Sequence, residues 1–281
     1  MVLRLDPRYP VAWRSPTSMQ LGFTHAPLIL DDVSPATERM IAALVAGISD
    51  TGLDMIGRSA GASAEEVAVF LERVRPALVV DVPERRHRVT VVGAGTTAEA
   101  VAGLLAAAGI DVIATRSAGR AADTEADLVV IVAGYAVRPE LAATWLRRDV
   151  PHLAVVLGDD TADVGPLVVP GGSACLLCLA HHATDADTAW PVLATQLHGR
   201  PSPADTALLA AEVAVTVVRL VRDHLGGVSP ATGEVVRIDA MNGTRTARGV
   251  APHPLCGCLA MPLASAATRS VPRASASAAT R

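Results

Sequence analysis

The sequence predicts an α/β fold. A winged-helix-like α+β module at residues 1–84 is followed by a Rossmann-like doubly wound domain at residues 85–263 whose C-terminal part carries paired cysteines. Three observations predict this arrangement: apolar runs of strand length alternate with helical periodicity after residue 88, a glycine-rich turn follows the first run, and four cysteines lie two and two. The last segment, residues 264–281, contains mainly Ala, Ser, Thr, Arg and Pro and is predicted to be a disordered tail.

The composition restricts the kind of partner. The 281 residues are 51% hydrophobic but only 2% aromatic, so Ala, Val, Leu and Ile must fill the interior. A formal net charge of -4 gives no general attraction to nucleic acid or to an anionic membrane. All 24 basic residues are arginine, which excludes a Schiff base and a phosphate-binding lysine. A small molecule or another protein is therefore the expected partner.

The chain is expected in the cytoplasm. Arg4, Asp6 and Arg8 interrupt the apolar run that an export signal requires. The long apolar stretch from Ala204 to Leu225 includes five charged residues, which a bilayer would penalise heavily. This stretch therefore predicts a buried helix and no membrane partner.

The first 80 residues carry strand and helix signals of a small module. The expected elements are a hairpin of residues 19–23 and 28–30, helices that begin after Ser34, at Leu53 and after Ser63, and a strand at residues 78–80. Ser34 precedes a proline, and Ser63 forms a capping-box pattern with Glu66. Such a module often binds DNA, but its basic residues are scattered among acidic ones, so a protein or peptide partner is favoured.

The remainder of the chain carries the alternation of a parallel sheet. The expected strands are residues 88–92, 111–114, 128–132 and 152–157, and the expected helices are residues 97–108 and 140–148. After Gly165 the character changes, because prolines and glycines lead into the first cysteine pair. A long helix at residues 204–225 and strands at residues 234–238 and 244–248 lead to the second pair.

A glycine turn follows the first strand of this domain. Gly93, Gly95, Thr96 and Thr97 fit the G-x-G-x-x-G/A pattern between a strand and a helix. Glycine permits a tight turn and close backbone approach, and the amides of the helix N-terminus can hold a phosphate. These four residues are the candidate nucleotide-binding residues.

The end of the next strand argues against an ordinary dinucleotide site. Thr115 and Arg116 stand there, where a carboxylate would hold a ribose. Arg116 is a candidate contact for a 2′-phosphate. Three interpretations remain open: a purely structural glycine turn, which is favoured, an adenine-nucleotide site, and a nicotinamide-cofactor site.

The cysteines form two short pairs, Cys175-x-x-Cys178 and Cys256-x-Cys258. Four thiolates are the ligand set of tetrahedral structural zinc, so the pairs predict a zinc knuckle that joins distant segments. A redox pair and buried free thiols are the alternatives. A closed four-sulfur site offers no position to a substrate and leaves no cysteine for a covalent thioester.

Histidines accompany both cysteine pairs. His181 and His182 follow the first pair, and His253 precedes the second. One of them could replace a cysteine as ligand, but solvated or supporting histidines are favoured.

These features together resemble the ubiquitin-activating-enzyme-like superfamily. The similarity rests on the glycine turn, on Gly165-Pro166-x-x-x-Pro170-Gly171 before the first cysteine pair, and on His253-Pro254 before the second. With the module in front, the layout over residues 1 to 260 resembles the ThiF-like leader-peptide-binding partner proteins of thiazole/oxazole-modified microcin (TOMM) biosynthesis.

The resemblance implies a zinc-stabilised adaptor. The N-terminal module would bind the leader of a ribosomally made precursor peptide as an added strand, and the α/β domain would dock a separate YcaO-type cyclodehydratase. Leu21, Phe23, Leu28 and Leu30 are expected to shape the peptide-binding edge. Related folds imply a homodimer.

Departures from the adenylating members of the superfamily indicate a chain that is not catalytic alone. Those enzymes use a ribose-binding carboxylate, a catalytic lysine and often a cysteine nucleophile, whereas Thr115 stands near the carboxylate position and the chain has no lysine and no spare cysteine. The first alternative is an ATP-dependent ThiF-like adenylyltransferase that acts on a peptide or sulfur-carrier C-terminus. The second is a zinc-containing DNA-binding regulator.

Overall fold

The computed structural model describes residues 2–79, 86–228 and 232–259. The chain divides into two compact units, Met1–Glu84 and Arg85–Arg281, each with its own hydrophobic core. The predicted disordered tail and the last residue of the predicted strand at 78–80 lie outside the described residues.

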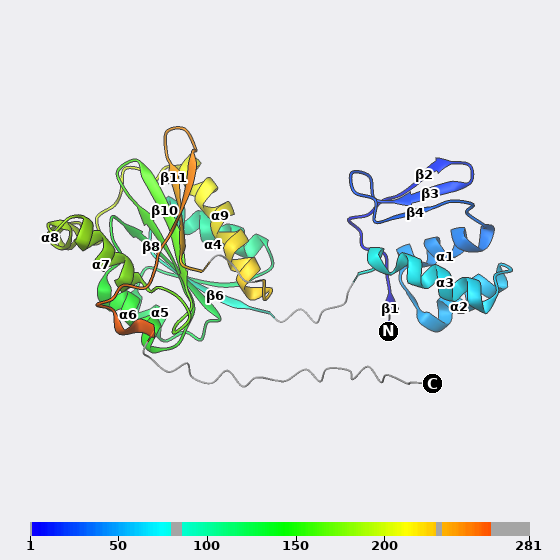
Figure 1. Cartoon of the computed structure of the whole chain (residues 1–281), viewed down its shortest axis with the longest axis horizontal. Helices are drawn as coiled ribbons and strands as arrows, with labels where there is room; N and C mark the ends of the chain where they lie inside the picture. Colours follow the sequence, from blue (N-terminus) through cyan, green and yellow to red (C-terminus); the bar gives the residue numbers. More distant parts are fainter. Residues whose placement is uncertain (1, 80–85, 229–231, 260–281) are drawn as a thin grey trace, which may run out of the picture. The chain divides into compact units, whose positions relative to one another are not determined.

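The N-terminal unit combines short strands with three helices. Its elements are β1 (Val2–Leu3), β2 (Val11–Ser15), β3 (Ser18–Leu21), β4 (Leu28–Leu30), α1 (Pro35–Ala46), β5 (Ile48–Ser49), α2 (Asp50–Ser59), α3 (Ala64–Val74) and the short 3₁₀ helix η1 (Arg75–Ala77). β2, β3 and β4 form an antiparallel sheet that packs on the helices (Figure 1). β1 and β5 pair separately. The winged-helix-like assignment of this unit stays a prediction.

The predicted hairpin corresponds to β3 and β4, which pair with Met19 opposite Leu30. β2 adds a third strand that the sequence did not indicate. The predicted strand at residues 78–80 is wrong, because its described part makes only an isolated bridge between Leu78 and Leu5. Two backbone hydrogen bonds make this bridge, from the Val79 amide to the Arg4 carbonyl and from the Asp6 amide to the Ala77 carbonyl, but a single bridge is not a ladder.

Side-chain caps set the helix starts in this unit. Ser34 accepts a hydrogen bond from the Thr37 amide at 3.1 Å, and Ser63 forms a reciprocal capping box with Glu66. The second helix begins at Asp50 and not at Leu53, because Ser49 caps it three residues earlier than predicted.

The second unit is built around a seven-stranded sheet. Its strands are β6 (Arg88–Val92), β7 (Asp111–Thr115), β8 (Leu128–Gly134), β9 (His152–Leu157), β10 (Thr161–Val168), β11 (Glu234–Asp239) and β12 (Arg245–Gly249). The spatial order is β12-β11-β10-β9-β8-β6-β7, in which β6 to β9 run parallel and β10 to β12 are antiparallel. The Rossmann-like half therefore has the order β7-β6-β8-β9, with its topological switch point between β6 and β8.

Helices cover both faces of this sheet. They are α4 (Thr96–Ala107), α5 (Ala118–Ala122), α6 (Pro139–Arg147), α7 (Leu176–Ala186), α8 (Trp190–Leu197) and α9 (Ala207–Leu225), with a 3₁₀ turn η2 (Gly257–Leu259). α4 and α9 pack on one face, and α6 and α7 pack on the other (Figure 1). Consecutive residues of β8 serve opposite faces, since Val130 joins the first core and Ile131 the second.

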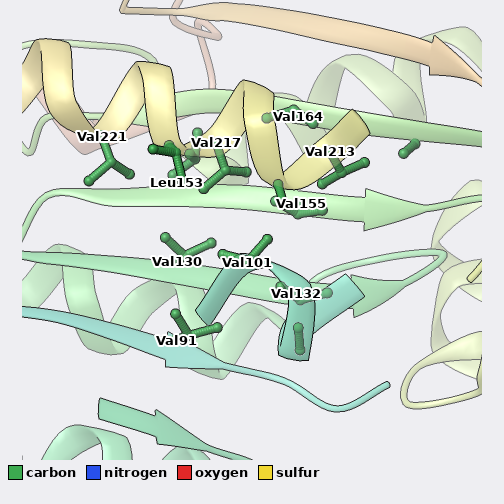
Figure 2. Close-up of a cluster of buried hydrophobic side chains, with 14 of the residues drawn as sticks. Val91, Val101, Val130, Val132, Leu153, Val155, Val164, Val213, Val217 and Val221 are labelled. Carbon is green, nitrogen blue, oxygen red and sulfur yellow. The ribbon is translucent and has the colours of Figure 1, made fainter. Parts of the chain in front are cut away.

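The α9 side of the sheet is an aliphatic core. Val213, Val217 and Val221 lie along one side of α9 and point toward the sheet, where Leu153 and Val155 of β9 meet them (Figure 2). All five side chains have no exposed surface. This packing explains the apolar run predicted to be a buried helix, and no helix in the described ranges is long and apolar enough to cross a bilayer.

The segment after residue 160 differs from the prediction. β10 runs through Gly165 and Pro166, which the sequence suggested were part of an irregular connection. The ladder with β9 is interrupted between Val164 and Leu167, so the glycine and proline occupy an irregularity where strand pairing is not required. A Cβ at Gly165 would lie 2.3 Å from the Glu234 carbonyl oxygen, so close packing against β11 requires glycine.

His152 is a buried histidine at the start of β9. It has no exposed surface, its Nδ1 lies 2.9 Å from the Val150 carbonyl, and its Nε2 has no partner. Burial lowers the pKa of His152 to about 4, despite the opposing effect of the hydrogen bond to Val150. The folded state therefore holds the neutral imidazole, with the Nδ1 proton donated to Val150.

Acidification is expected to destabilise the second unit through His152. Its folded pKa lies below the unfolded value of about 6.5, so stability is full above pH 6.5 and falls as pH decreases toward 4, by about 3 kcal/mol. The His152→Leu variant should show a correspondingly flatter free energy of unfolding against pH in urea titrations. The exposed His25→Leu substitution is the control, and equal slopes for His152→Leu and wild type would contradict the assignment.

Candidate functional site

The two cysteine pairs meet at the N-terminus of α7. Cys175 is the N-cap residue of α7 and Cys178 lies in its first turn. Cys256 immediately precedes η2 and Cys258 lies within it, about 80 residues later. In Figure 1 this late segment, drawn in orange-red, runs beside α7 and α6. The fold therefore brings all four predicted ligands together.

The sulfur atoms are spaced as a four-coordinate metal requires. The Sγ–Sγ distances are 3.8 Å for Cys175–Cys178, 3.6 Å for Cys175–Cys256 and 3.5 Å for Cys178–Cys258. A tetrahedron with metal–sulfur bonds of about 2.3 Å has edges of about 3.8 Å. A disulfide requires about 2.05 Å, and all four cysteines are free. The cluster could hold a metal ion.

Burial makes two of the four thiols, those of Cys175 and Cys258, depend on a cation for ionisation. It raises the pKa of Cys175, and it raises the pKa of Cys258 to about 11. Burial also acts to raise the pKa of Cys178, but hydrogen bonds, first among them one from the backbone amide of His253, outweigh it and lower that pKa. A divalent cation would reverse the preference at the buried thiols, because a coordinating thiol is deprotonated.

Histidines and one aspartate lie next to the cysteines. His253 is 6% exposed and its Nε2 lies 2.9 Å from Asp185 Oδ2. His181 stacks on the His253 ring with centroids 4.8 Å apart, and His182 packs edge-on at 4.9 Å. The predicted supporting histidines thus contact one another beside the four sulfur atoms.

The glycine turn lies where β6 ends and α4 begins, at the topological switch point. Gly93 and Gly95 both have positive φ, at 154° and 100°. A Cβ on Gly93 would lie 2.6 Å from the Val132 carbonyl oxygen of β8. The Gly93 amide bonds the Thr115 carbonyl at 3.0 Å. The first glycine is therefore required for packing between β6, β7 and β8.

The N-terminus of α4 already holds an anion that the chain itself supplies. The Asp205 carboxylate accepts hydrogen bonds from the Thr96 amide at 3.0 Å, the Thr97 amide at 2.8 Å and the Thr97 hydroxyl at 2.6 Å. A Cβ on Gly95 would lie 2.1 Å from Asp205 Oδ2, so only glycine fits beneath this carboxylate. The amides expected to hold a phosphate are used within the protein.

The segment before Asp205 crosses the ends of the neighbouring strands. A Cβ on Gly134, at the end of β8, would lie 2.2 Å from the Arg200 carbonyl oxygen. The Ser202 hydroxyl donates to the Gly158 carbonyl just after β9. Residues 200–205 thus contact the carboxyl end of β8 first, then the residue after β9, and finally the turn after β6. These ends are where an open α/β sheet binds its ligand.

Arg116 does not contact this turn. Its guanidinium lies 3.7 Å from Glu99 Oε1, and both side chains are more than 70% exposed. Such an exposed pair contributes little to stability. The assignment of Gly93, Gly95, Thr96, Thr97 and Arg116 to nucleotide binding stays a prediction, and it would require Asp205 to leave the α4 N-terminus.

The four residues expected at a peptide-binding edge have different environments. Leu21 and Leu30 are buried in the core of the N-terminal unit, with 0% and 3% exposure. Leu28 is partly buried, and Phe23, in the β3–β4 turn, is 84% exposed. Only Phe23 presents a large apolar surface to solvent, while Leu21 and Leu30 support the sheet from within.

Sequence reasoning missed Asp205. It precedes α9 by two residues and stands 108 positions from its partner Thr97, so no local pattern connects the two. In the sequence alone, an acidic residue just before Thr206, the N-cap of α9, indicates only a favourable charge at the start of that helix. The sequence signal that could have indicated such a partner is the glycine turn. The helix after it, with Gly95 as its N-cap, begins without a side-chain cap of its own, so its first amides need an acceptor from elsewhere.

A small α+β unit before a Rossmann-like α/β unit defines the class of this fold, and solved structures share it. The heterocyclase TruD aligns with a TM-score of 0.65 and 20% identity, over 92% of this chain and 42% of that one. A heterocyclase in complex with substrate and cofactor aligns with a TM-score of 0.62 and 18% identity, over 89% and 38%. This chain therefore spans about two-fifths of the length of these heterocyclases.

MccB has the same fold at a comparable length. E. coli MccB with ATP aligns with a TM-score of 0.57 and 14% identity, over 92% of this chain and 99% of that one. MccB in complex with N-formylated MccA aligns with a TM-score of 0.57 and 15% identity, over 92% and 100%. No protein-family model and no curated protein sequence matches the chain. The solved structures thus establish a fold of the heterocyclase and MccB type.

Removal of the Asp205 carboxylate should destabilise the second unit. The Asp205→Ala variant leaves two helix-terminal amides and a hydroxyl without their acceptor, so the free energy of unfolding should fall by about 0.5 to 2 kcal/mol. Urea denaturation monitored by circular dichroism measures this. The exposed Asp159→Ala substitution between β9 and β10 is the control. Equal losses in both variants would show that Asp205 has no special role.

Proposed function

We propose that the chain is a zinc-stabilised, non-catalytic adaptor that binds the leader of a ribosomally made precursor peptide and presents it to a YcaO-type cyclodehydratase. The observation that carries the proposal is the Asp205 carboxylate at the α4 N-terminus. This carboxylate occupies the amides that would hold a phosphate in a nucleotide-binding fold, while the scaffold of that fold is retained. The chain has no lysine that could compensate for the negative charge.

The comparisons support a peptide as the ligand. A match over 92% of the chain must include most of the unit Met1–Glu84, so the N-terminal unit belongs to the shared architecture. One such neighbour is MccB in complex with N-formylated MccA. The matched heterocyclases are more than twice as long as this chain. Because the Asp205 carboxylate occupies the α4 N-terminus, we assign the chemistry to a separate catalytic partner, and we expect the adaptor to act as a homodimer.

The proposed peptide site is the outer edge of β4. Arg73 of α3 donates from Nη2 to the Ile29 carbonyl at 3.2 Å, so this carbonyl faces away from β3. The amide of a strand residue points to the same side as its carbonyl, which leaves the Ile29 amide available for an added strand. Ile29 is 39% exposed, and Val69, one turn before Arg73 on α3, is 54% exposed. These apolar surfaces suit alternate side chains of an extended peptide.

The proposed metal is Zn²⁺. Four cysteine sulfurs in a nearly closed tetrahedron select a soft or borderline ion, and oxygen-preferring ions such as Mg²⁺ are disfavoured. A closed set of four ligands excludes substrate. When bound, zinc would join α7 to the segment after β12 and stabilise the second unit without taking part in a reaction.

The second candidate function is an ATP-dependent adenylyltransferase. It is favoured by the glycine turn and by the likeness to MccB, one of whose structures contains ATP. Pyrophosphate exchange with ATP and Mg²⁺ separates the two functions. We expect no exchange and no bound ATP in native mass spectrometry. Specific ATP binding with exchange would replace the adaptor by the enzyme.

Peptide binding should depend on the β4 edge. The Ile29→Asp variant places a desolvated charge against the incoming strand, and Phe23→Ala removes the exposed ring of the β3–β4 turn, so each should weaken leader binding at least tenfold. Fluorescence anisotropy with fluorescein-labelled synthetic leaders of candidate precursors measures the affinity. The matched control is Val11→Asp on β2, the opposite edge, where exposure is similar at 36%.

The control also tests the choice of edge. Loss of binding in Val11→Asp alone would move the peptide to β2. Unchanged affinity in all three variants would remove the peptide-binding surface from the N-terminal unit.

Metal content should follow the cysteines. The purified chain should contain one zinc per chain by inductively coupled plasma mass spectrometry, and Cys178→Ser or Cys258→Ser should lose it and lower the melting temperature of the second unit. Leu177→Ala, an exposed residue between the first two ligands, is the matched control. A metal-free wild-type chain with two disulfides would contradict the zinc assignment.

A further inference from the structure

His253 connects the two cysteine pairs through its backbone. Its amide hydrogen-bonds the Cys178 sulfur in the first pair. Its carbonyl accepts a hydrogen bond from the Cys256 amide at 2.9 Å in the second pair. One residue outside the set of sulfur ligands therefore contacts both halves of the metal centre.

The His253 side chain fixes the same segment to α7. Nδ1 accepts a hydrogen bond from the Leu255 amide at 3.1 Å, so the ring proton resides on Nε2 and is donated to Asp185 Oδ2 at 2.9 Å. Asp185 lies on α7, between two and three turns after the first cysteine pair. The buried ring also stacks on His181. We call the His253–Asp185 hydrogen bond, with its backbone contacts, the latch.

A second side-chain contact, also from α7, holds the segment that contains His253. His182 Nε2 lies 2.8 Å from the Ala251 carbonyl. Between β12 and η2 the described chain has no helix or strand, so side-chain contacts must fix the path of this segment. The second cysteine pair thus reaches the first pair along a segment that α7 holds from the side.

His182, Asp185 and His253 also offer ligand atoms within 4.8 Å of one another, but their hydrogen bonds disfavour a second ion. A metal on His253 Nε2 would move the proton to Nδ1, where the Leu255 amide already donates. That amide would lose its acceptor. His253 is placed as a neutral imidazole, which accepts a hydrogen bond from the Leu255 amide and donates one to the Asp185 carboxylate.

We propose that His253 and Asp185 are positioning residues that hold Cys256 and Cys258 in the metal-binding arrangement and thereby set the metal affinity. The inference rests on the metal centre of the proposed function. Without the latch, closing the site must also order the segment from residue 251 to residue 258, and that cost reduces the free energy of metal binding. The latch affects the metal only through the geometry of the cysteines.

The test is metal affinity in four variants. Apo-protein is titrated with Co²⁺ and with Zn²⁺ in competition with a chromophoric chelator. Asp185→Ala and His253→Ala should bind each ion 10- to 100-fold more weakly than wild type. Asp185→Asn keeps an oxygen that accepts from Nε2 and should restore most of the affinity. Thr184→Ala, the adjacent residue on α7, should match wild type.

The Co²⁺ absorption spectrum separates positioning from ligation. Four thiolates give a characteristic tetrahedral spectrum, and Asp185→Ala at saturating Co²⁺ should reproduce the wild-type bands. A shifted spectrum would make Asp185 a ligand and overturn the latch. Unchanged affinity in both alanine variants, with lower melting temperatures in apo- and metal-bound protein alike, would show a merely structural pair and also overturn it.

Failure of the latch and failure of the metal centre give different results. If wild-type protein binds no stoichiometric metal, the proposed centre fails and the latch fails with it. If wild type binds one ion tightly and Asp185→Ala binds it equally well, the latch alone fails.

Discussion

The Asp205 carboxylate, which accepts hydrogen bonds from the first turn of α4, ties together two segments of the α/β unit that lie far apart in the sequence. These hydrogen bonds connect the glycine turn after β6 with the segment before α9, and α4 and α9 then pack side by side on the sheet. The arrangement demands glycine at position 95, since a Cβ would meet the carboxylate. The contact thus fixes the start of α4 relative to the segment that leads into α9.

The local features of the fold follow from the sequence because short-range chemistry determines them. The caps at Ser34 and Ser63 lie where their patterns indicate, and the strands β6 and β9 have the predicted bounds. β10 was not predicted, since Gly165 and Pro166 are ordinary breakers unless an irregular ladder accepts them. Tertiary context outweighs local propensity there.

The candidate sites show the same division between local pattern and long-range contact. Cysteine spacing predicts a common metal centre because two pairs of thiols have few alternative uses in one chain, and the sulfurs do come together. The glycine pattern leaves a phosphate site open beside the favoured structural turn, and it cannot reveal that a carboxylate 108 residues away from Thr97 occupies the amides. On β3 the alternation of polar and apolar residues does place Leu21 on the core face, whereas β4 is apolar at all three positions, so its pattern cannot reveal that Leu30 is buried and Ile29 exposed.

The carboxylate at the α4 N-terminus also affects how the stability of this unit depends on the concentration of a bound ligand. A nucleotide stabilises a fold only as far as its concentration exceeds its dissociation constant, so such a fold follows the energy state of the cell. Asp205 belongs to the same molecule, and its local concentration does not change with dilution or with nucleotide supply. In this structure the first turn of α4 is therefore held by a group of the chain itself, which is present at every nucleotide concentration.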